Sequence, residues 1–205
     1  MKAQELKGAI SCISKVMTAQ RDYLVELDSQ NGDGDLGISM SSGYQAIDAY
    51  LKMTDEADLG RLMMQCSSVF NEAAPSSLGT IMSFGMIGMA KKLKGKTEIS
   101  VDELADALQA GVSFIMEKAK SKPGEKTILD ALCPAVEVLK ANSAKSAKEA
   151  FDAAAKAASE GSEKTKEMRS VHGRAAYYGD KSIGILDGGS VVGKLLFTAI
   201  ADYLA

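Results

Sequence analysis

The chain of 205 residues is poor in several residue types that particular functions require. Its single histidine, His172, leaves histidine-based catalysis and histidine-rich metal sites almost nothing to work with. Its three cysteines, Cys12, Cys66 and Cys133, are far apart, which disfavours a disulfide framework or a zinc site and indicates a reducing cytoplasm. No apolar run reaches the roughly 18 residues of a membrane span, and the first residues lack the apolar stretch of a secretory signal.

The overall composition is that of a globular protein. Hydrophobic residues make up 46% of the chain and charged residues 25%, with a net charge of −3. This balance argues against non-specific binding to nucleic acid or to an acidic membrane. The length suits one domain with a sizeable core.

The hydrophobic pattern has the period of a helix almost throughout. The first stripe, interrupted only at Gln20, runs through Leu6, Ile10, Ile13, Met17, Leu24 and Leu27. A second stripe follows Leu104, Leu108, Val112, Ile115 and Ala119, and the segment 144–159 is rich in alanine, the best helix former. Pro134 falls inside a helical pattern, which predicts a kink or a break nearby.

Glycine-bearing breaks separate about eight helices and lie near residues 29–34, 54–58, 73–76, 94–99, 121–125, 141–144, 160–163 and 179–188. Clear period-two strands, internal repeats and long linkers are missing. The sequence therefore predicts an all-α fold in which residues 1–205 form one eight-helix antiparallel bundle or closed barrel.

Three aspartates, Asp28, Asp33 and Asp35, lie within eight residues, with glycines at 32, 34 and 37 between and after them. Carboxylates so close repel one another, and a hard cation such as Mg²⁺ or Ca²⁺ relieves the repulsion. A solvated acidic turn is the alternative. Asp35 is placed to cap a helix that begins near Leu36. Asp28 ends a helix, where the helix dipole disfavours an anion, so a bound cation explains it better.

The sequence contains near matches to three familiar glycine motifs, and each match fails at a required residue or in its structural context. Residues 32–37 match G-x-G-x-x-G, yet a helix precedes them and two aspartates occupy the variable positions. The EF-hand pattern fails because Leu36 stands where glycine is needed and Ser42 where glutamate is needed. Residues 188–195 differ from a P-loop at Leu195, which indicates a helix that starts at glycine.

Three other segments present polar or glycine-rich helix starts. Ser76 and Ser77 offer hydroxyls and backbone N–H groups to an anion, with helix capping by Ser76 as the alternative. Residues 123–130, Pro-Gly-Glu-Lys-Thr-Ile-Leu-Asp, form a second start. In the glycine-rich stretch 173–189, Arg174 is suited to bind a phosphate, and an ion pair with Asp180 or Asp187 is the ordinary alternative.

Taken in order, these motifs resemble the L subunit of dihydroxyacetone kinase. The order is Leu-Asp-x-x-x-Gly-Asp-Gly-Asp, a serine-rich helix start, Pro-Gly-x-Lys-Thr-x-x-Asp-Ala-Leu-x-Pro-Ala, and Gly-Arg-Ala-x-Tyr-x-Gly-x-x-Ser-x-Gly-x-x-Asp-x-Gly. The resemblance covers roughly residues 5–200. It implies an eight-helix antiparallel barrel with a nucleotide, ADP or ATP, held at one end.

The resemblance also implies roles for individual residues. Asp28, Asp33 and Asp35 correspond to the family's ligands for two Mg²⁺ ions. The nucleotide contacts correspond to Leu36, Gly37, Ile38, Ser39, Ser76, Ser77, Thr127, Ile128, Arg174, Asp187 and Gly188. Ile128 corresponds to the apolar contact on the adenine side.

The family commonly has Asp-His-Gly at residues 35–37, Asp-Pro-Gly at 187–189 and paired glycines at 73–74. This chain has Leu36, Gly188, Ala73 and Ala74 at the differing positions. These departures leave the metal ligands unchanged. They put the phosphate contacts and the identity of the substrate in question.

By the resemblance, the chain is a phosphoryl-transfer subunit that needs no catalytic residue of its own beyond positioning and metal. A separate K-type subunit holds a short ketose such as dihydroxyacetone. Either ATP is the substrate, or bound ADP is rephosphorylated by an M-type phosphocarrier of the phosphotransferase system. A free-standing chain favours the second mode. Whether the chain forms a homodimer is left open.

Two other classes of function stay open at this point. The chain could be a non-catalytic nucleotide sensor that binds a transcription regulator. It could also be a structural helical domain whose aspartates hold Ca²⁺.

Overall fold

The computed structural model describes residues 1–205 as an all-helical domain. Its only strand-like pairing is an isolated bridge between Lys2 and Glu98. The helices are α1 (Ala3–Ala19), α2 (Arg21–Asp28), α3 (Leu36–Met53), α4 (Leu59–Ala73), α5 (Ser77–Leu93), α6 (Val101–Ala119), α7 (Leu129–Ala141), α8 (Ala147–Lys164) and α9 (Gly188–Tyr203), with two 3-10 helices, η1 (Thr165–Glu167) and η2 (Arg174–Ser182). None of them is both long and apolar enough to cross a membrane.

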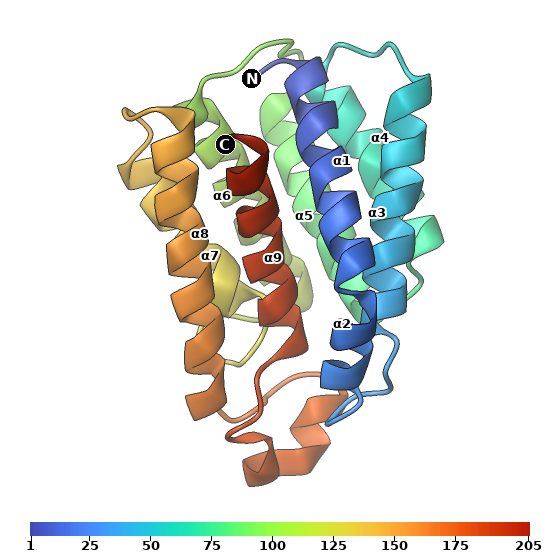
Figure 1. The fold of residues 1–205 in the computed structure, drawn as a ribbon, viewed down its shortest axis with the longest axis vertical. Coiled ribbons are helices and arrows are strands. Elements are labelled where there is room, and N and C mark those ends of the chain that lie inside the picture. The colour runs from blue at the N-terminus through green and yellow to red at the C-terminus, as the bar shows by residue number, and fades with distance from the viewer.

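The long helices run up and down around one core (Figure 1). Successive helices from α3 to α9 pack against one another, and the ring closes where α1 contacts α3 and α9. Both chain termini lie at the upper end, whereas η2 and the turn between α2 and α3 lie at the lower end (Figure 1). The predicted antiparallel bundle or barrel is confirmed.

The hydrophobic stripes of the sequence form the core. All six members of the first stripe are buried, and the helix they predicted is interrupted at Gln20, where α1 gives way to α2. The structure therefore has nine α-helices, or eight if α1 and α2 are counted as one interrupted helix. The backbones of α5 and α6 nearly touch, since a Cβ added to Gly88 would lie 2.6 Å from the carbonyl oxygen of Ala110.

The predicted break at residues 160–163 is wrong, because α8 continues to Lys164. Gly161 serves close packing instead: a Cβ at this position would lie 2.1 Å from the carbonyl oxygen of Asp130. In a regular helix the N–H four residues later would donate to this carbonyl, but residue 134 is a proline and has no N–H. The carbonyl oxygen of Asp130 is therefore left without a helical hydrogen bond, and α8 packs directly against it. Helix α7 runs unbroken through Pro134. The loop predicted at 179–188 begins only after Ser182, because η2 extends to that residue.

We expect the substitution Gly161→Val to lower the free energy of unfolding by about 1–3 kcal/mol, because the added side chain would force α8 away from α7. Urea denaturation measures the change. Glu160→Ala, at the exposed neighbouring position, is the matched control and should shift stability by less than about 0.5 kcal/mol. Equal stability of Gly161→Val and wild type would contradict the packing role.

Candidate functional site

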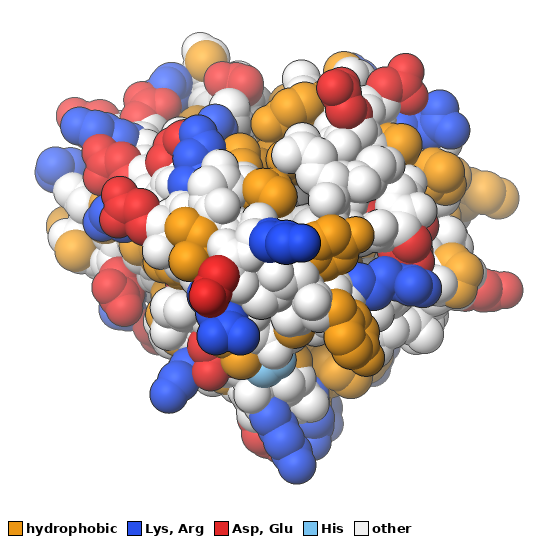
Figure 2. All heavy atoms as spheres, turned by 90° about the horizontal axis from the view of Figure 1, so that it is seen from below, with side chains coloured by type: hydrophobic (Ala, Val, Ile, Leu, Met, Phe, Trp, Pro, Cys, Tyr) orange, Lys and Arg blue, Asp and Glu red, His pale blue; other side chains and the backbone are white.

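A cleft with a volume of about 810 Å³ opens at the lower end of the barrel. Helices α3, α5, α7 and α9 all begin beside this cleft, whose walls include Leu36, Ser77, Ile128 and Gly188. Each helix N-terminus carries a partial positive charge and free backbone N–H groups. Four such ends at one cleft therefore favour an anionic ligand. Figure 2 views this end of the molecule, where basic, acidic and hydrophobic side chains are interspersed.

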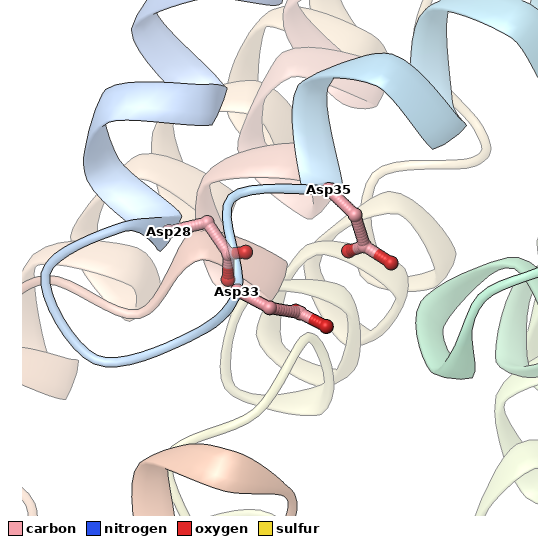
Figure 3. A group of neighbouring side chains, drawn as sticks. All are labelled: Asp28, Asp33 and Asp35. Carbon is pink, nitrogen blue, oxygen red and sulfur yellow. The ribbon is translucent and has the colours of Figure 1, made fainter.

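The acidic loop between α2 and α3 forms one side of the cleft. Asp28 comes from the last residue of α2, Asp33 from the loop and Asp35 from the residue before α3, and their side chains lie close together (Figure 3). One carboxylate oxygen from each lies within 4.8 Å of the others. The structure thus confirms the prediction that these three carboxylates lie close together in space.

One local expectation about these aspartates was wrong, and Asp28 has a hydrogen-bond partner that the sequence did not predict. Asp35 has helical dihedral angles (φ −89°, ψ −12°) and makes no capping hydrogen bond, so the first turn of α3 has no side-chain cap. Asp28 has a structural partner, since its Oδ2 accepts a hydrogen bond of 2.8 Å from the N–H of Gly34. That bond folds the loop back and directs Asp28 toward the other carboxylates. Gly34 has φ +75°, the left-handed conformation that glycine adopts readily.

The charges of the acidic loop are imperfectly balanced by the protein. Desolvation, followed by the carboxylates of Asp33 and Asp28, raises the pKa of Asp35 above its ordinary value, while Arg174 opposes this shift. Nη2 of Arg174 lies 2.9 Å from Oδ2 of Asp33. The predicted alternative partners of Arg174 were Asp180 and Asp187, and both are wrong: Asp180 pairs with Arg169 at 3.5 Å. One arginine thus faces three carboxylates.

Asp187 lies at the start of α9 and lines the cleft. Its Oδ2 accepts a hydrogen bond of 2.6 Å from the N–H of Ser190, so it caps the helix. Desolvation raises the pKa of Asp187 to about 7, with the Asp130 carboxylate acting in the same direction and the Ser190 N–H and Lys126 opposing it. The group therefore titrates near neutral pH.

The loop 121–128 forms the adjacent wall. The buried carboxylate of Asp130 accepts hydrogen bonds from the N–H groups of Gly124 and Thr127, at 2.5 and 2.7 Å. These bonds close the Pro-Gly-x-Lys-Thr segment into a tight turn and present Thr127 and Ile128 to the cleft. On the same side, Nε2 of His172 lies 2.6 Å from Oε2 of Glu125 and joins this loop to the segment before η2.

The cleft brings together most of the residues predicted from the sequence. Its lining includes Asp28, Asp33, Asp35, Leu36, Ser76, Ser77, Thr127, Ile128, Arg174, Asp187 and Gly188. Three others do not line it: Gly37 faces α2, where an added Cβ would lie 2.0 Å from the carbonyl oxygen of Arg21, Ser39 is buried and Ile38 is 48% exposed. As contacts to a nucleotide, all of these stay predictions. Ser76 also caps α5 by accepting a 3.1 Å hydrogen bond from the N–H of Gly79.

Sequence reasoning missed several residues of the cleft. Lys126, His172 and Asn31 line it but were not proposed as site residues. Lys126 and Asn31 sit inside motifs that had been recognised for their neighbours, so proximity to Thr127 and Asp33 was an available signal. His172 had no such signal, because only the folded chain places it beside Glu125.

The donor set fits a hard divalent cation. Oxygens bound to one octahedral Mg²⁺ lie at most about 4.1 Å apart, twice its roughly 2.05 Å bond length. The three carboxylates need only small side-chain movements to share one ion, and their spacing also suits two ions. All donors are oxygens, the ligands that Mg²⁺ and Ca²⁺ prefer.

The DAK2 domain model matches residues 30–202. The chain belongs to the DAK2 domain family. Among its relatives, the ADP-binding subunit DhaL of PEP-dependent dihydroxyacetone kinase 2 from Listeria innocua is 31% identical over 188 residues, which cover 90% of this chain and 87% of that subunit. The corresponding subunit of Escherichia coli is 27% identical over 85% of this chain and 84% of its own length.

This DAK2 domain also resembles one part of larger proteins. Rat triokinase/FMN cyclase is 29% identical over 98% of this chain, which corresponds to 35% of that protein. The crystal structure of the C. freundii dihydroxyacetone kinase in complex with AMP-PNP and Mg²⁺ matches with a TM-score of 0.77 at 23% identity, covering 96% of this chain and 33% of that one. That similarity confirms the fold.

Asp187 predicts a pH dependence of stability in this DAK2 domain. An acid whose pKa is raised on folding, here from 3.8 to about 7, holds its proton in the folded state but not in the unfolded state between those values. Wild type should therefore lose stability relative to Asp187→Asn as the pH rises from 4 to 7, since asparagine still caps the helix. Urea denaturation at intervals across this range measures the difference, and a constant difference would contradict the raised pKa.

Proposed function

We propose that the chain is an ADP- or ATP-binding, Mg²⁺-dependent phosphoryl-transfer subunit of a dihydroxyacetone or related short-ketose kinase. One observation carries the proposal: three carboxylates within 4.8 Å of one another lie in the same cleft as four helix N-termini. The carboxylates favour cations and the helix ends favour anions. A magnesium–polyphosphate complex supplies both, with its metal toward the aspartates and its phosphates toward the helix starts.

In this proposal the protein contributes position and charge. Asp28, Asp33 and Asp35 hold the metal, and Arg174 is free to turn from Asp33 toward a phosphate once the metal balances the carboxylates. Magnesium would neutralise the phosphate charge and polarise the phosphoryl group that is transferred. No side chain of this chain is assigned as a general base, because the cleft offers one histidine, His172, which pairs with Glu125.

The nucleotide base would lie near the apolar wall. Ile128 and Ile81 line the cleft, and Ile128 approaches the start of α9. The metal-binding loop and this wall belong to the same 810 Å³ cleft, a size within the range of pockets that bind small molecules.

The partners follow from the relatives. Several of them are named as ADP-binding subunits of PEP- or PTS-dependent dihydroxyacetone kinases. We therefore infer that a separate K-type subunit holds the ketose and that an M-type phosphocarrier rephosphorylates ADP that stays bound between turnovers.

Thermal unfolding tests nucleotide binding. ADP at about 100 times its Kd, with Mg²⁺, stabilises a binding protein by about 2.7 kcal/mol, which for this size raises Tm by roughly 5–10 °C. Chelation of Mg²⁺ and the substitution Asp33→Ala should each abolish this shift, because the phosphates would then face uncompensated carboxylates. Asp22→Ala, an exposed aspartate of α2 outside the cluster, should keep it. The absence of any shift for wild type first freed of copurifying nucleotide would remove the nucleotide function, including the sensor alternative, and leave a structural cation site.

Phosphoryl transfer separates an enzyme from a nucleotide sensor. We expect dihydroxyacetone phosphate to form only when the chain, a K-type subunit and a source of phosphoryl groups are combined. The phosphotransferase components should support turnover with the copurifying nucleotide, whereas ATP alone should support little. Tight ADP binding without transfer to any K-type partner would instead favour the regulatory alternative.

A further inference from the structure

Lys126 occupies an unusual position in the cleft wall. The residue is 3% exposed. Its three N–H groups are shared among four backbone carbonyl oxygens: Thr165 at 2.7 Å, Met168 at 3.2 Å, Ser182 at 2.7 Å and Ile185 at 2.6 Å from Nζ. Buried lysines are rare unless a partner compensates for the lost hydration. Here the carbonyl oxygens replace the hydration shell.

The four acceptors all belong to one segment, residues 165–187, which connects α8 to α9 and lies at the lower end of the barrel (Figure 1). Between residues 166 and 186 only Ser170 and Ser182 are buried, and both are polar. Its hydrophobic contact with the core comes from Leu186, which is only partly buried and lies at the very end of the segment. Its own hydrogen bonds, such as that from Gly184 N–H to the Lys166 carbonyl, fold it locally. The Lys126 ammonium ties it to the neighbouring loop at four points.

The same segment supplies part of the cleft. Arg174, which pairs with Asp33, and His172, which pairs with Glu125, both come from it, and Asp187 ends it. Lys126 itself immediately precedes Thr127 and Ile128 on the adjoining wall. It also adopts φ +60°, a left-handed conformation that is uncommon outside glycine. Lys126 thus joins the two walls through buried hydrogen bonds, in addition to the more exposed pair of His172 with Glu125.

We propose that Lys126 is the positioning residue of this site: its ammonium group holds the 165–187 segment where Arg174 and Asp187 can meet the nucleotide. The four carbonyl oxygens form a cage of acceptors that suits the N–H groups of an ammonium ion. The inference rests on the proposed function for its nucleotide readout, whereas the position of the segment can be measured without any nucleotide.

The test uses the full chain with Lys126→Ala. This substitution removes three carbon atoms and the ammonium group, the same number of heavy atoms that n-propylammonium contains. Hydrogen–deuterium exchange over residues 168–186 should be faster in the variant, and the affinity for ADP with Mg²⁺ should fall by about tenfold or more, as expected for lost hydrogen bonds from a charged donor. n-Propylammonium chloride should slow the exchange and restore affinity. Tetramethylammonium chloride at equal concentration should do neither, because it has no N–H.

Two further variants control the result. Lys122→Ala removes an exposed lysine from the same loop and should leave both readouts unchanged. Lys126→Met keeps the length of the side chain but no donor, and should behave like Lys126→Ala without responding to n-propylammonium. Far-UV circular dichroism should show native helicity in both Lys126 variants.

Several outcomes would overturn the proposal. Exchange over 168–186 at the wild-type rate in Lys126→Ala would show that the ammonium does not hold the segment. Loss of helicity in both Lys126 variants would make the lysine a determinant of the whole fold. Equal rescue by tetramethylammonium would attribute the effect to ionic strength. Wild type that fails to bind ADP with Mg²⁺ would instead refute the proposed function, and the exchange experiment would still decide the role of Lys126.

Discussion

The alternating direction of the helices is the constraint on which the site depends. Because each helix from α3 onward reverses the direction of the one before, α3, α5, α7 and α9 all begin at the lower end of the barrel (Figure 1). Their dipoles place partial positive charges at that end. The same alternation places Asp28, at the end of α2, and Asp35, just before α3, at the same cleft. The topology therefore brings two opposite charge preferences together, and an anion or a cation alone would satisfy only one of them.

The helix ends are capped sparingly, which leaves donors for a ligand. Helix α3 has no side-chain cap, and α5 and α9 each have one N–H satisfied by a capping side chain, from Ser76 and Asp187. By contrast α6 and α8, which begin at the opposite end, both have capping boxes with a serine and a glutamate. A capping box also satisfies the N–H of the cap residue, so the starts of α3, α5 and α9 are capped more sparingly and retain free N–H groups toward the cleft. The start of α7 differs, because Thr127 accepts from the N–H of Leu129 and Asp130 accepts from the N–H of Thr127.

Local patterns in the sequence predicted the elements, and long-range contacts decided what the sequence could not predict. The stripe from Leu6 to Leu27 and the clustered aspartates depend on neighbours in the chain, and both were found as expected. The partner of Arg174 lies 141 positions away at Asp33, so charge pattern alone pointed to the nearer Asp180 and Asp187. The sequence pattern predicts a helix break at Gly161, yet in the structure this glycine packs against the carbonyl oxygen of Asp130 on α7. The four acceptors of Lys126 are backbone carbonyl oxygens. Every residue has one, so the sequence could not predict which of them bind the lysine.

The two departures from the family pattern at the cleft lie in contact with each other. A Cβ added to Gly188 would lie 2.6 Å from Cδ2 of Leu36, which is too close for any side chain while the leucine keeps its position. Leu36 is buried and lines the cleft beside Asp35. A proline at 188 would therefore clash with Leu36, and glycine removes that clash. The contact of Leu36 with Gly188 makes this part of the cleft floor apolar, directly beside Asp35 and Asp187, the residues that precede them.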